Sequence, residues 1–472
     1  MIQLEGKKVA ILGRDPSGES ALALARGRGA EACLLPANHS PAPGDPVPDI
    51  AVLSAGCQRR RSEFEAWASR GAVILGEREL AFQLSLCLHV AVAGASGKRT
   101  TTDLIAHILR STGRRVEIAH GVDRPACSWV EASRDLEFLV HGVEVSEFEF
   151  LEHFRPVVAV LLNAPADHPG PEESWDDHVR RLSQLFARQQ PFDWAILQAE
   201  ALAHFRAVDV DLPGKVVSFS AFSRQADLGM ERGLLVSRWD TWTGPLWDMA
   251  RGRMRGSHFA ENALAALAVG RVLRLSLDEM VHALDTFVPG PSCFECISEA
   301  EGVRYIDDGR CRNLDALVKG LMTAAPVPAE QPSIWLIAGG ASLGRQFYDV
   351  GPVLSPRVKH AMLYGEAAPA MRAAWSLFTP CTLVPSLLDA AHRAVAQAAS
   401  GETVLYSPAC PSSARPDQPP SGSDVFREVV RDHLTRRGGP AGAGAADSSN
   451  GAEGSQASMP NPSPTTSIPP VG

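Results

Sequence analysis

The sequence has no uninterrupted apolar run of the roughly 20 residues that a membrane-spanning helix requires. Its longer apolar runs, such as residues 157–162, have the length of strands. It also has no excess of basic residues, because its formal net charge is −9. General nucleic-acid-binding proteins normally present a basic surface. We therefore expect no membrane insertion and no nucleic-acid partner.

The sequence also lacks a second cysteine pair with zinc-site spacing. Its nine cysteines are scattered and odd in number, and Cys293 and Cys296 form a single C-x-x-C. With no signal peptide, this pattern indicates a reducing environment, and we expect a cytoplasmic protein. Hydrophobic residues make up 45% of the 472 residues, which is ample core for several globular domains.

Large apolar residues are almost absent from the end of the chain. Residues 437–472 consist largely of Gly, Ala, Ser and Pro, and such a segment cannot bury enough surface to offset its ordering entropy. We predict that it is disordered. Upstream, strand-like and helix-like segments alternate, which predicts an α/β fold. We place one domain boundary near Leu88, before the segment that holds residues 94–102, and a second at the helix- and strand-breaking sequence Pro289-Gly290-Pro291. The predicted domains are residues 1–88, 89–290 and 291–436.

The most informative stretch is residues 94–102, which read G-A-S-G-K-R-T-T-T. An apolar strand precedes it and a helical pattern follows it, so it has the form of a phosphate-binding loop. It is not a complete G-x-x-x-x-G-K-[ST] motif, because Arg99 stands where a magnesium-binding hydroxyl is expected. A glycine-rich turn with a surface lysine is the alternative. The predicted phosphate-binding residues are Gly94, Ala95, Ser96, Gly97, Lys98, Arg99 and Thr100.

Other polar residues follow predicted strands, where parallel sheets bind ligands. Glu144 ends one apolar segment, and a carboxylate near a phosphate loop suits Mg²⁺. Asp167 and His168 follow the buried strand of residues 157–163. Ser54 and Gly56 follow an earlier strand. Solvated strand ends, a surface histidine and an ordinary α/β turn are the corresponding alternatives.

Seven short segments, in order along residues 5–435, resemble motifs of the Mur ligase family. They resemble the S-P-G, G-T-N-G-K-S-T, E-x-S-S-F-Q-L, N-x-x-x-D-H, G-x-H-N-x-x-N-x-L-A-A, N-D-S-K-A-T-N and S-P-A-C-A-S patterns. The E-x-S-x-F and S-P-A-C pieces favour the D-glutamate-adding branch of the family. The matching segments are residues 54–56, 94–100, 144–150, 163–168, 256–266, 307–313 and 407–412.

The resemblance implies a three-domain Mur ligase architecture. A Rossmann-like N-terminal domain would hold the UDP precursor, a central P-loop ATPase domain would bind ATP, and a Rossmann-like C-terminal domain would bind the amino acid. Such enzymes form amide bonds in peptidoglycan precursor synthesis through an acyl phosphate. The implied substrates are UDP-N-acetylmuramoyl-L-alanine and D-glutamate, with ATP and Mg²⁺ as cofactors and a monomer as the expected state.

The resemblance also implies roles for individual residues. Lys98, Glu144, His168 and Arg310 would be catalytic, with Glu144 and His168 also binding Mg²⁺. Asn262 would contact the nucleotide. The residues implied in substrate binding are Ser54 and Gly56 for the UDP precursor, and Arg312 and Ser412 for the amino acid.

Several positions depart from the family pattern at points of chemistry. Arg99 replaces a hydroxyl ligand of Mg²⁺, Leu182 stands where the family has a carbamylated lysine, and Leu343 replaces a lysine that meets the amino-acid carboxylate. Arg310 replaces a lysine but keeps its charge, and Arg312 replaces a threonine. Two alternatives to the D-glutamate ligase therefore stay open. They are a catalytically impaired relative that binds nucleotide or muramoyl precursor, and an amide ligase with a different substrate.

Overall fold

The computed structural model describes residues 2–42, 44–57, 60–164, 174–252, 256–325, 331–342, 347–410 and 421–437. Four positions singled out from the sequence, Asp167, His168, Leu343 and Ser412, lie outside these ranges. Arg437, where the disordered tail was predicted to begin, is the last residue of a helix, and the remainder of the tail lies outside the described residues.

The described residues form three sheets, which define a first, a second and a third unit. The first sheet is fully parallel, in the order β2-β1-β3-β4. Its strands and helices are β1 (Lys8–Leu12), α1 (Pro16–Gly27), β2 (Glu31–Leu35), β3 (Ile50–Leu53), α2 (Glu65–Ala68), β4 (Val73–Gly76) and α3 (Glu77–Leu84).

The second sheet has nine strands in the order β13-β12-β11-β10-β9-β8-β5-β7-β6. Strands β5 to β11 are parallel, whereas β12 and β13 continue the sheet in antiparallel fashion, which the sequence reading did not predict. The strands are β5 (Leu88–Ala93), β6 (Val116–His120), β7 (Phe138–Gly142), β8 (Val158–Leu161), β9 (Trp194–Gln198), β10 (Lys215–Ser220), β11 (Leu228–Glu231), β12 (Leu234–Ser237) and β13 (Gly244–Asp248). The helices are α4 (Lys98–Ser111), α5 (Trp175–Ser183), α6 (Ala199–Ala207), α7 (Ser257–Val272) and α8 (Leu277–Thr286).

The third sheet has the order β14-β15-β19-β16-β17-β18, and all its pairs are parallel except the β14–β15 hairpin. The strands are β14 (Glu295–Ala300), β15 (Val303–Asp307), β16 (Ile334–Gly339), β17 (Val358–Tyr364), β18 (Cys381–Leu383) and β19 (Thr403–Ala409). The helices are α9 (Leu314–Ala324), α10 (Gly351–Leu354), α11 (Ala368–Trp375), α12 (Leu387–Gln397) and α13 (Gly422–Arg437).

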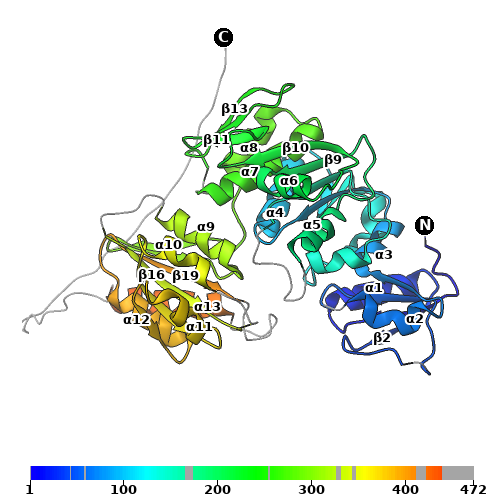
Figure 1. Cartoon of the computed structure of the whole chain (residues 1–472), viewed down its shortest axis with the longest axis horizontal. Helices are drawn as coiled ribbons and strands as arrows, with labels where there is room; N and C mark the ends of the chain where they lie inside the picture. The colour runs from blue at the N-terminus through cyan, green and yellow to red at the C-terminus, as the bar shows by residue number, and fades with distance from the viewer. Residues whose placement is uncertain are drawn as a thin grey trace, which may run out of the picture.

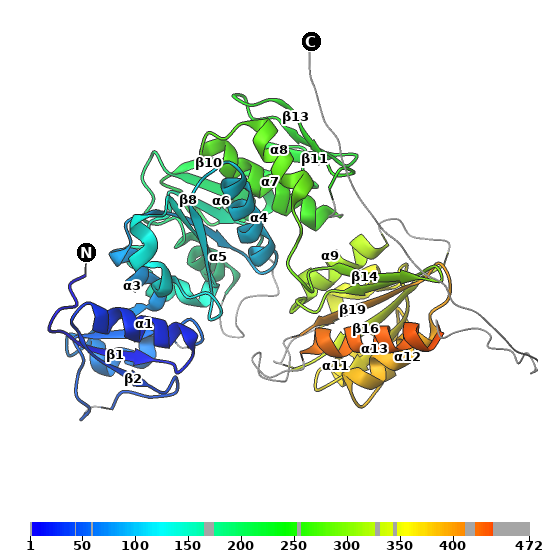
Figure 2. The same cartoon turned by 180° about the vertical axis from the view of Figure 1, so that it is seen from behind.

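The three units form an arc with the second unit in the middle, as both views show (Figures 1 and 2). The mixture of parallel sheets with covering helices confirms the predicted α/β class. None of the helices among the described residues is long and apolar enough to cross a membrane.

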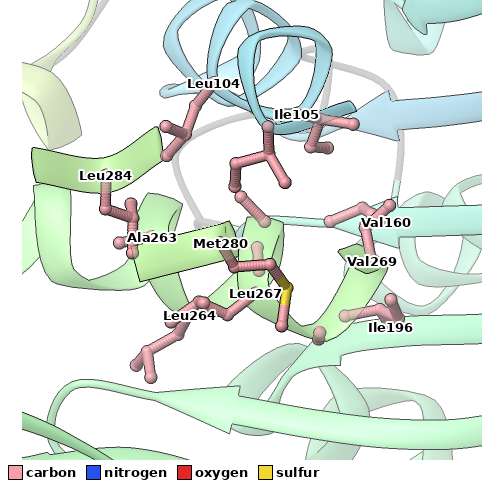
Figure 3. Close-up of a cluster of buried hydrophobic side chains, with 14 of the residues drawn as sticks. Leu104, Ile105, Val160, Ile196, Ala263, Leu264, Leu267, Val269, Met280 and Leu284 are labelled. Carbon is pink, nitrogen blue, oxygen red and sulfur yellow. The ribbon is translucent and has the colours of Figure 1, made fainter. Parts of the chain in front are cut away.

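The core of the second unit holds helix α4 in place. Leu104 and Ile105 of α4 lie in the same buried cluster as Ala263 and Leu267 of α7 and Met280 of α8 (Figure 3). Alanine-rich α7 packs closely against α4 because its side chains are small. This packing fixes the start of α4, which is where the predicted phosphate loop ends.

The first and second units are joined through a buried arginine, Arg78 of α3, whose side chain is 2% exposed. Its guanidinium donates to Glu147 at 2.9 Å, to the Gly142 carbonyl at 3.0 Å and to Nδ1 of His141 at 2.6 Å. A guanidinium can only donate, so Nδ1 of His141 accepts and its Nε2–H donates to Nδ1 of His89 at 2.7 Å. The hydrogen bonds therefore hold both imidazoles neutral.

This arrangement predicts a loss of stability in acid. Burial lowers the pKa of His89 and of His120 to about 3, and that of His141 well below its usual value. The unfolded chain, with histidine pKa values near 6.5, binds more protons below that pH. Each histidine therefore contributes stability that is fully present above about pH 6.5 and declines, as pH falls towards the folded pKa, by about 1.4 kcal/mol per pH unit.

Urea unfolding between pH 7 and 5.5 tests this prediction. Burial also raises the pKa of Glu77 and of Asp308 to about 7, and these two groups act in the opposite direction. The test therefore compares the pH dependence of the unfolding free energy between variants and the unchanged protein. We expect His89→Gln to reduce the pH dependence of the unfolding free energy, and the exposed control His392→Gln to leave it unchanged. An unaltered slope in His89→Gln would contradict the assignment.

Candidate active site

The predicted phosphate loop connects β5 to α4 and depends on two glycines. Gly94 has a φ of +143° and Gly97 a φ of +84°, both in the region that side chains rarely adopt. A Cβ atom on Gly97 would lie 2.7 Å from Oδ1 of Asn262, and one on Gly94 would lie 3.1 Å from Cβ of Leu162. The loop is therefore a close-packed backbone turn that side chains would disrupt.

Asn163, which lies just after β8, holds this loop in place through side-chain hydrogen bonds to its backbone. Its Oδ1 accepts from the backbone N–H groups of Ala95 at 2.7 Å and Ser96 at 3.1 Å, and its Nδ2 donates to the Ser96 carbonyl at 3.1 Å. The residue is 7% exposed. The sequence reading placed Asn163 in a motif but assigned it no role. The contact spans 68 positions, and no local pattern indicates it.

Lys98 opens helix α4 and points back over the loop. Its Nζ donates to the Gly94 carbonyl at 2.7 Å and lies 3.2 Å from the carboxylate of Glu144, so the two sequence-predicted residues meet. The lysine side chain is 11% exposed and that of Glu144 is 49% exposed. The N-cap of α4 is Gly97, which makes no side-chain cap. The first N–H groups of α4 are thus available to an anion.

Arg99 and Arg310 belong to one cluster of charges beside the start of α4. Arg99 pairs with Asp123 at 2.9 Å. Burial raises the pKa of Asp103 in α4 and of the Cys293 thiol, and the positive charges of Arg99 and Arg310 oppose both shifts. Arg310 of the third unit therefore lies close enough to the phosphate-loop helix to act on groups there. Its position provides positive charge near the site.

Two motifs of the third unit meet at one pair of side chains. Asp308 accepts a hydrogen bond from Ser407 at 2.8 Å, although the two residues are 99 positions apart. Its neighbour Asp307 is fully buried and accepts from Ser292, Ser423 and Arg427. Arg312, which follows in the same segment, is exposed, and Ser412 lies outside the described residues.

Helix α9 of the third unit rests directly on the phosphate loop. The N-cap residue Asn313 donates to the Ala95 carbonyl at 3.1 Å. Ser96 donates to Asp315 at 2.5 Å and lies 3.4 Å from Nζ of Lys319. Asn313 ends the sequence motif of residues 307–313, which gave it no role, and Asp315 and Lys319 of α9 lie outside that motif. Only the packing of the two units brings these three residues to the loop.

In the first unit, Ser54 and Gly56 lie at the carboxyl end of β3. The Ser54 hydroxyl is 3% exposed and donates to Asp15, the N-cap residue of α1, at 2.7 Å. A Cβ atom on Gly56 would lie 2.4 Å from the same carboxylate and 3.3 Å from Val122 of the second unit. These residues therefore lie where the strand ends of the first unit face the second.

Leu182 lies in an apolar environment. It is 1% exposed and belongs to a buried cluster with Val179 and Phe186. The structure thus offers no oxygen atom from this side chain to a metal. Within the described part of the chain, no group of three or more His, Cys, Asp or Glu side chains is arranged to hold a metal ion.

Comparison with known proteins identifies similar sequences. The sequence model for the Mur ligase middle domain matches residues 92–270. The UDP-N-acetylmuramoylalanine--D-glutamate ligase of Symbiobacterium thermophilum is 30% identical over 374 residues, covering 77% of this chain and 80% of the relative. The corresponding ligase of Desulfitobacterium hafniense strain Y51 is 29% identical over 462 residues, covering 92% and 99%.

Solved structures show the same fold at low sequence identity. The MurF ligase of Thermotoga maritima in complex with ADP is 15% identical, with a TM-score of 0.59 and coverage of 92% of this chain and 96% of that one. A pseudomurein peptide ligase type C from Methanothermus fervidus is 14% identical, with a TM-score of 0.57 and coverage of 90% and 100%. These likenesses support the multi-domain arrangement of the three sheets.

Proposed function

This chain belongs to the Mur ligase family, and from that premise we propose that it is the ATP-dependent ligase that adds D-glutamate to UDP-N-acetylmuramoyl-L-alanine. Relatives of this name match most of the chain. The observation that carries the proposal is the phosphate loop itself, in which Lys98 lies between the Gly94 carbonyl and Glu144.

The residues of the loop fit the phosphates of ATP. Gly94 and Gly97 have no side chains, so a phosphate can approach the backbone of the loop closely. The start of α4 has no side-chain cap and offers its N–H donors to an anion. Lys98 would contact the β and γ phosphates, and the backbone of residues 94–100 would surround them. Asn262, which packs against Gly97, would contact the nucleotide.

Mg²⁺ fits this site if the protein supplies only one or two of its ligands. A nucleotide-bound Mg²⁺ takes one or two carboxylates, with phosphate oxygens and water as the other ligands. Glu144 would offer such a carboxylate beside Lys98. His168, the second ligand implied by the resemblance, lies outside the described residues. Arg99 cannot coordinate a cation, because its guanidinium has no acceptor.

Bound ATP would supply the phosphoryl group that turns the muramoyl-alanine carboxylate into an acyl phosphate, with ADP as the leaving group, and the amine of D-glutamate would then displace phosphate to form the amide bond. The chain's own residues would position the partners and stabilise the charge that is transferred. Ser54 and Gly56 would help to hold the UDP precursor at the first unit. Arg310 would supply positive charge near the loop, and Arg312 would bind a carboxylate of D-glutamate. Ser412 would complete the amino-acid site.

Phosphate release from ATP tests the proposal. We expect release only when UDP-N-acetylmuramoyl-L-alanine, D-glutamate and Mg²⁺ are all present, and no release when L-glutamate replaces D-glutamate. ATP binding measured by calorimetry serves as the control for a folded loop. Binding without turnover would identify the chain as a catalytically impaired relative, and turnover with another amino acid would identify a different ligase.

A further inference from the structure

We propose that Lys319 of helix α9 is a further nucleotide-contacting residue, which pairs with the terminal phosphate of ATP when that phosphate lies in the loop. The inference rests on the proposed function only in taking ATP as the nucleotide. The third unit would thereby supply a cation to a loop that belongs to the second unit. Nothing in the sequence patterns of the loop or of residues 307–313 indicates this lysine.

Helix α9 is held on the loop at its first turn. Asn313 uses both ends of its amide, because Oδ1 accepts from the Ala316 N–H at 2.8 Å and Nδ2 donates to the Ala95 carbonyl at 3.1 Å. One side chain therefore caps the helix and attaches it to the loop. Further along the helix, Thr323 lies against Gly256, where an added Cβ would be 2.2 Å from its hydroxyl oxygen. These two contacts set the position of the residues between them.

Lys319 lies between these contacts and faces the loop. Its Nζ is 3.4 Å from Oγ of Ser96, 2.9 Å from Asp315 one turn earlier, and 3.9 Å from Glu261 of α7. The lysine side chain is 16% exposed. Burial raises the pKa of Glu261, and the charge of Lys319 opposes that shift. The ammonium group is therefore held at the loop by carboxylates from both units.

A bound triphosphate would change the balance among these charges. Ser96 directly precedes Gly97 and Lys98, and its hydroxyl donates to the Asp315 carboxylate at 2.5 Å. A terminal phosphate near Ser96 would repel Asp315 and attract Lys319, since like charges are disfavoured at short range. Lysine is a compact point charge on a flexible stem, so a small movement of its amine brings it to a phosphate oxygen.

The affinities of ATP and ADP for the full-length protein test this inference without requiring catalysis. ADP lacks the terminal phosphate, so we expect Lys319→Met to weaken ATP binding about tenfold and ADP binding less than about twofold. Lys319→Arg should restore most of the ATP affinity. The matched control is Lys359→Met, which removes a third-unit lysine paired with Glu402 and should change neither affinity. Equal weakening of both nucleotides would overturn the proposal.

A second variant tests the same site with the opposite expected change in ATP affinity. Asp315→Asn keeps the shape of the side chain but removes the negative charge that opposes a phosphate at Ser96. We expect ATP to bind a few-fold more tightly to this variant and ADP to bind as before. This result would support the proposal even if Lys319→Met failed to fold, whereas unchanged or weaker ATP binding would count against it. Failure of the ligase assay with these binding results intact would reject the proposed reaction and not the role of Lys319.

Discussion

Replacing Lys98 by methionine is expected to lower kcat/KM for ATP-dependent phosphate release by at least about a hundredfold. The residue is the cation of the phosphate loop, held by the Gly94 carbonyl and by Glu144. Methionine has similar length and apolar volume but no charge, so it fills the same space without stabilising the transferred phosphoryl group. The measurement is steady-state phosphate release at saturating UDP-N-acetylmuramoyl-L-alanine and D-glutamate.

The control for this variant is Lys7→Met, because Lys7 is exposed and its nearest ionic partner, Asp49, is 3.7 Å away. We expect its activity to match that of the unchanged protein. Thermal unfolding of Lys98→Met checks that the variant is folded, because the substitution removes a hydrogen bond to the Gly94 carbonyl and an ion pair with half-exposed Glu144. If Lys98→Met retained full activity while remaining folded, the loop would not be the catalytic phosphate site.

Replacing Arg78 by methionine is expected to destabilise the protein by about 3–5 kcal/mol, which is the usual cost of removing one partner of a buried ion pair. Arg78 joins the first unit to Glu147, His141 and the Gly142 carbonyl of the second. Without it, three acceptors lose their donor, and Glu147 loses its partner cation although only 14% of its side chain is exposed. Urea unfolding monitored by circular dichroism measures the change.

Arg114→Met is the matched control, because this exposed arginine makes a single ion pair with Glu137 at 3.0 Å. Surface pairs of this kind contribute about 0–1 kcal/mol, so its unfolding free energy should change little. Limited proteolysis tests the junction between the first and second units, because Arg78→Met should accelerate cleavage of the chain after α3. Equal stability of the two variants would show that Arg78 does not hold the units together.

Local features of the site were accessible from sequence because their residues are close neighbours in the chain. Gly94, Gly97 and Lys98 lie within five positions and belong to one strand-turn-helix element. A position of Glu144 near the phosphate loop was also expected, since both follow strands of a parallel sheet whose carboxyl ends lie together, but its ion pair with Lys98 was not predicted. The edge strands β12 and β13 escaped prediction. Arg232 and Gly233, which connect β11 to β12, have the two positive φ values of a tight hairpin turn.

The sequence by itself determined the α/β class, the phosphate loop and the family resemblance, since each depends on short patterns of residue type and spacing. Tertiary structure alone decided what surrounds the loop. Asn163 bonds to its backbone, Asp123 pairs with Arg99, and helix α9 contacts Ser96. Ser96 and Asp315 are 219 positions apart, so their contact depends on how two separately folded sheets pack. The physical reason is that spacing along a chain specifies local geometry, whereas contacts between units depend on the complementarity of whole surfaces.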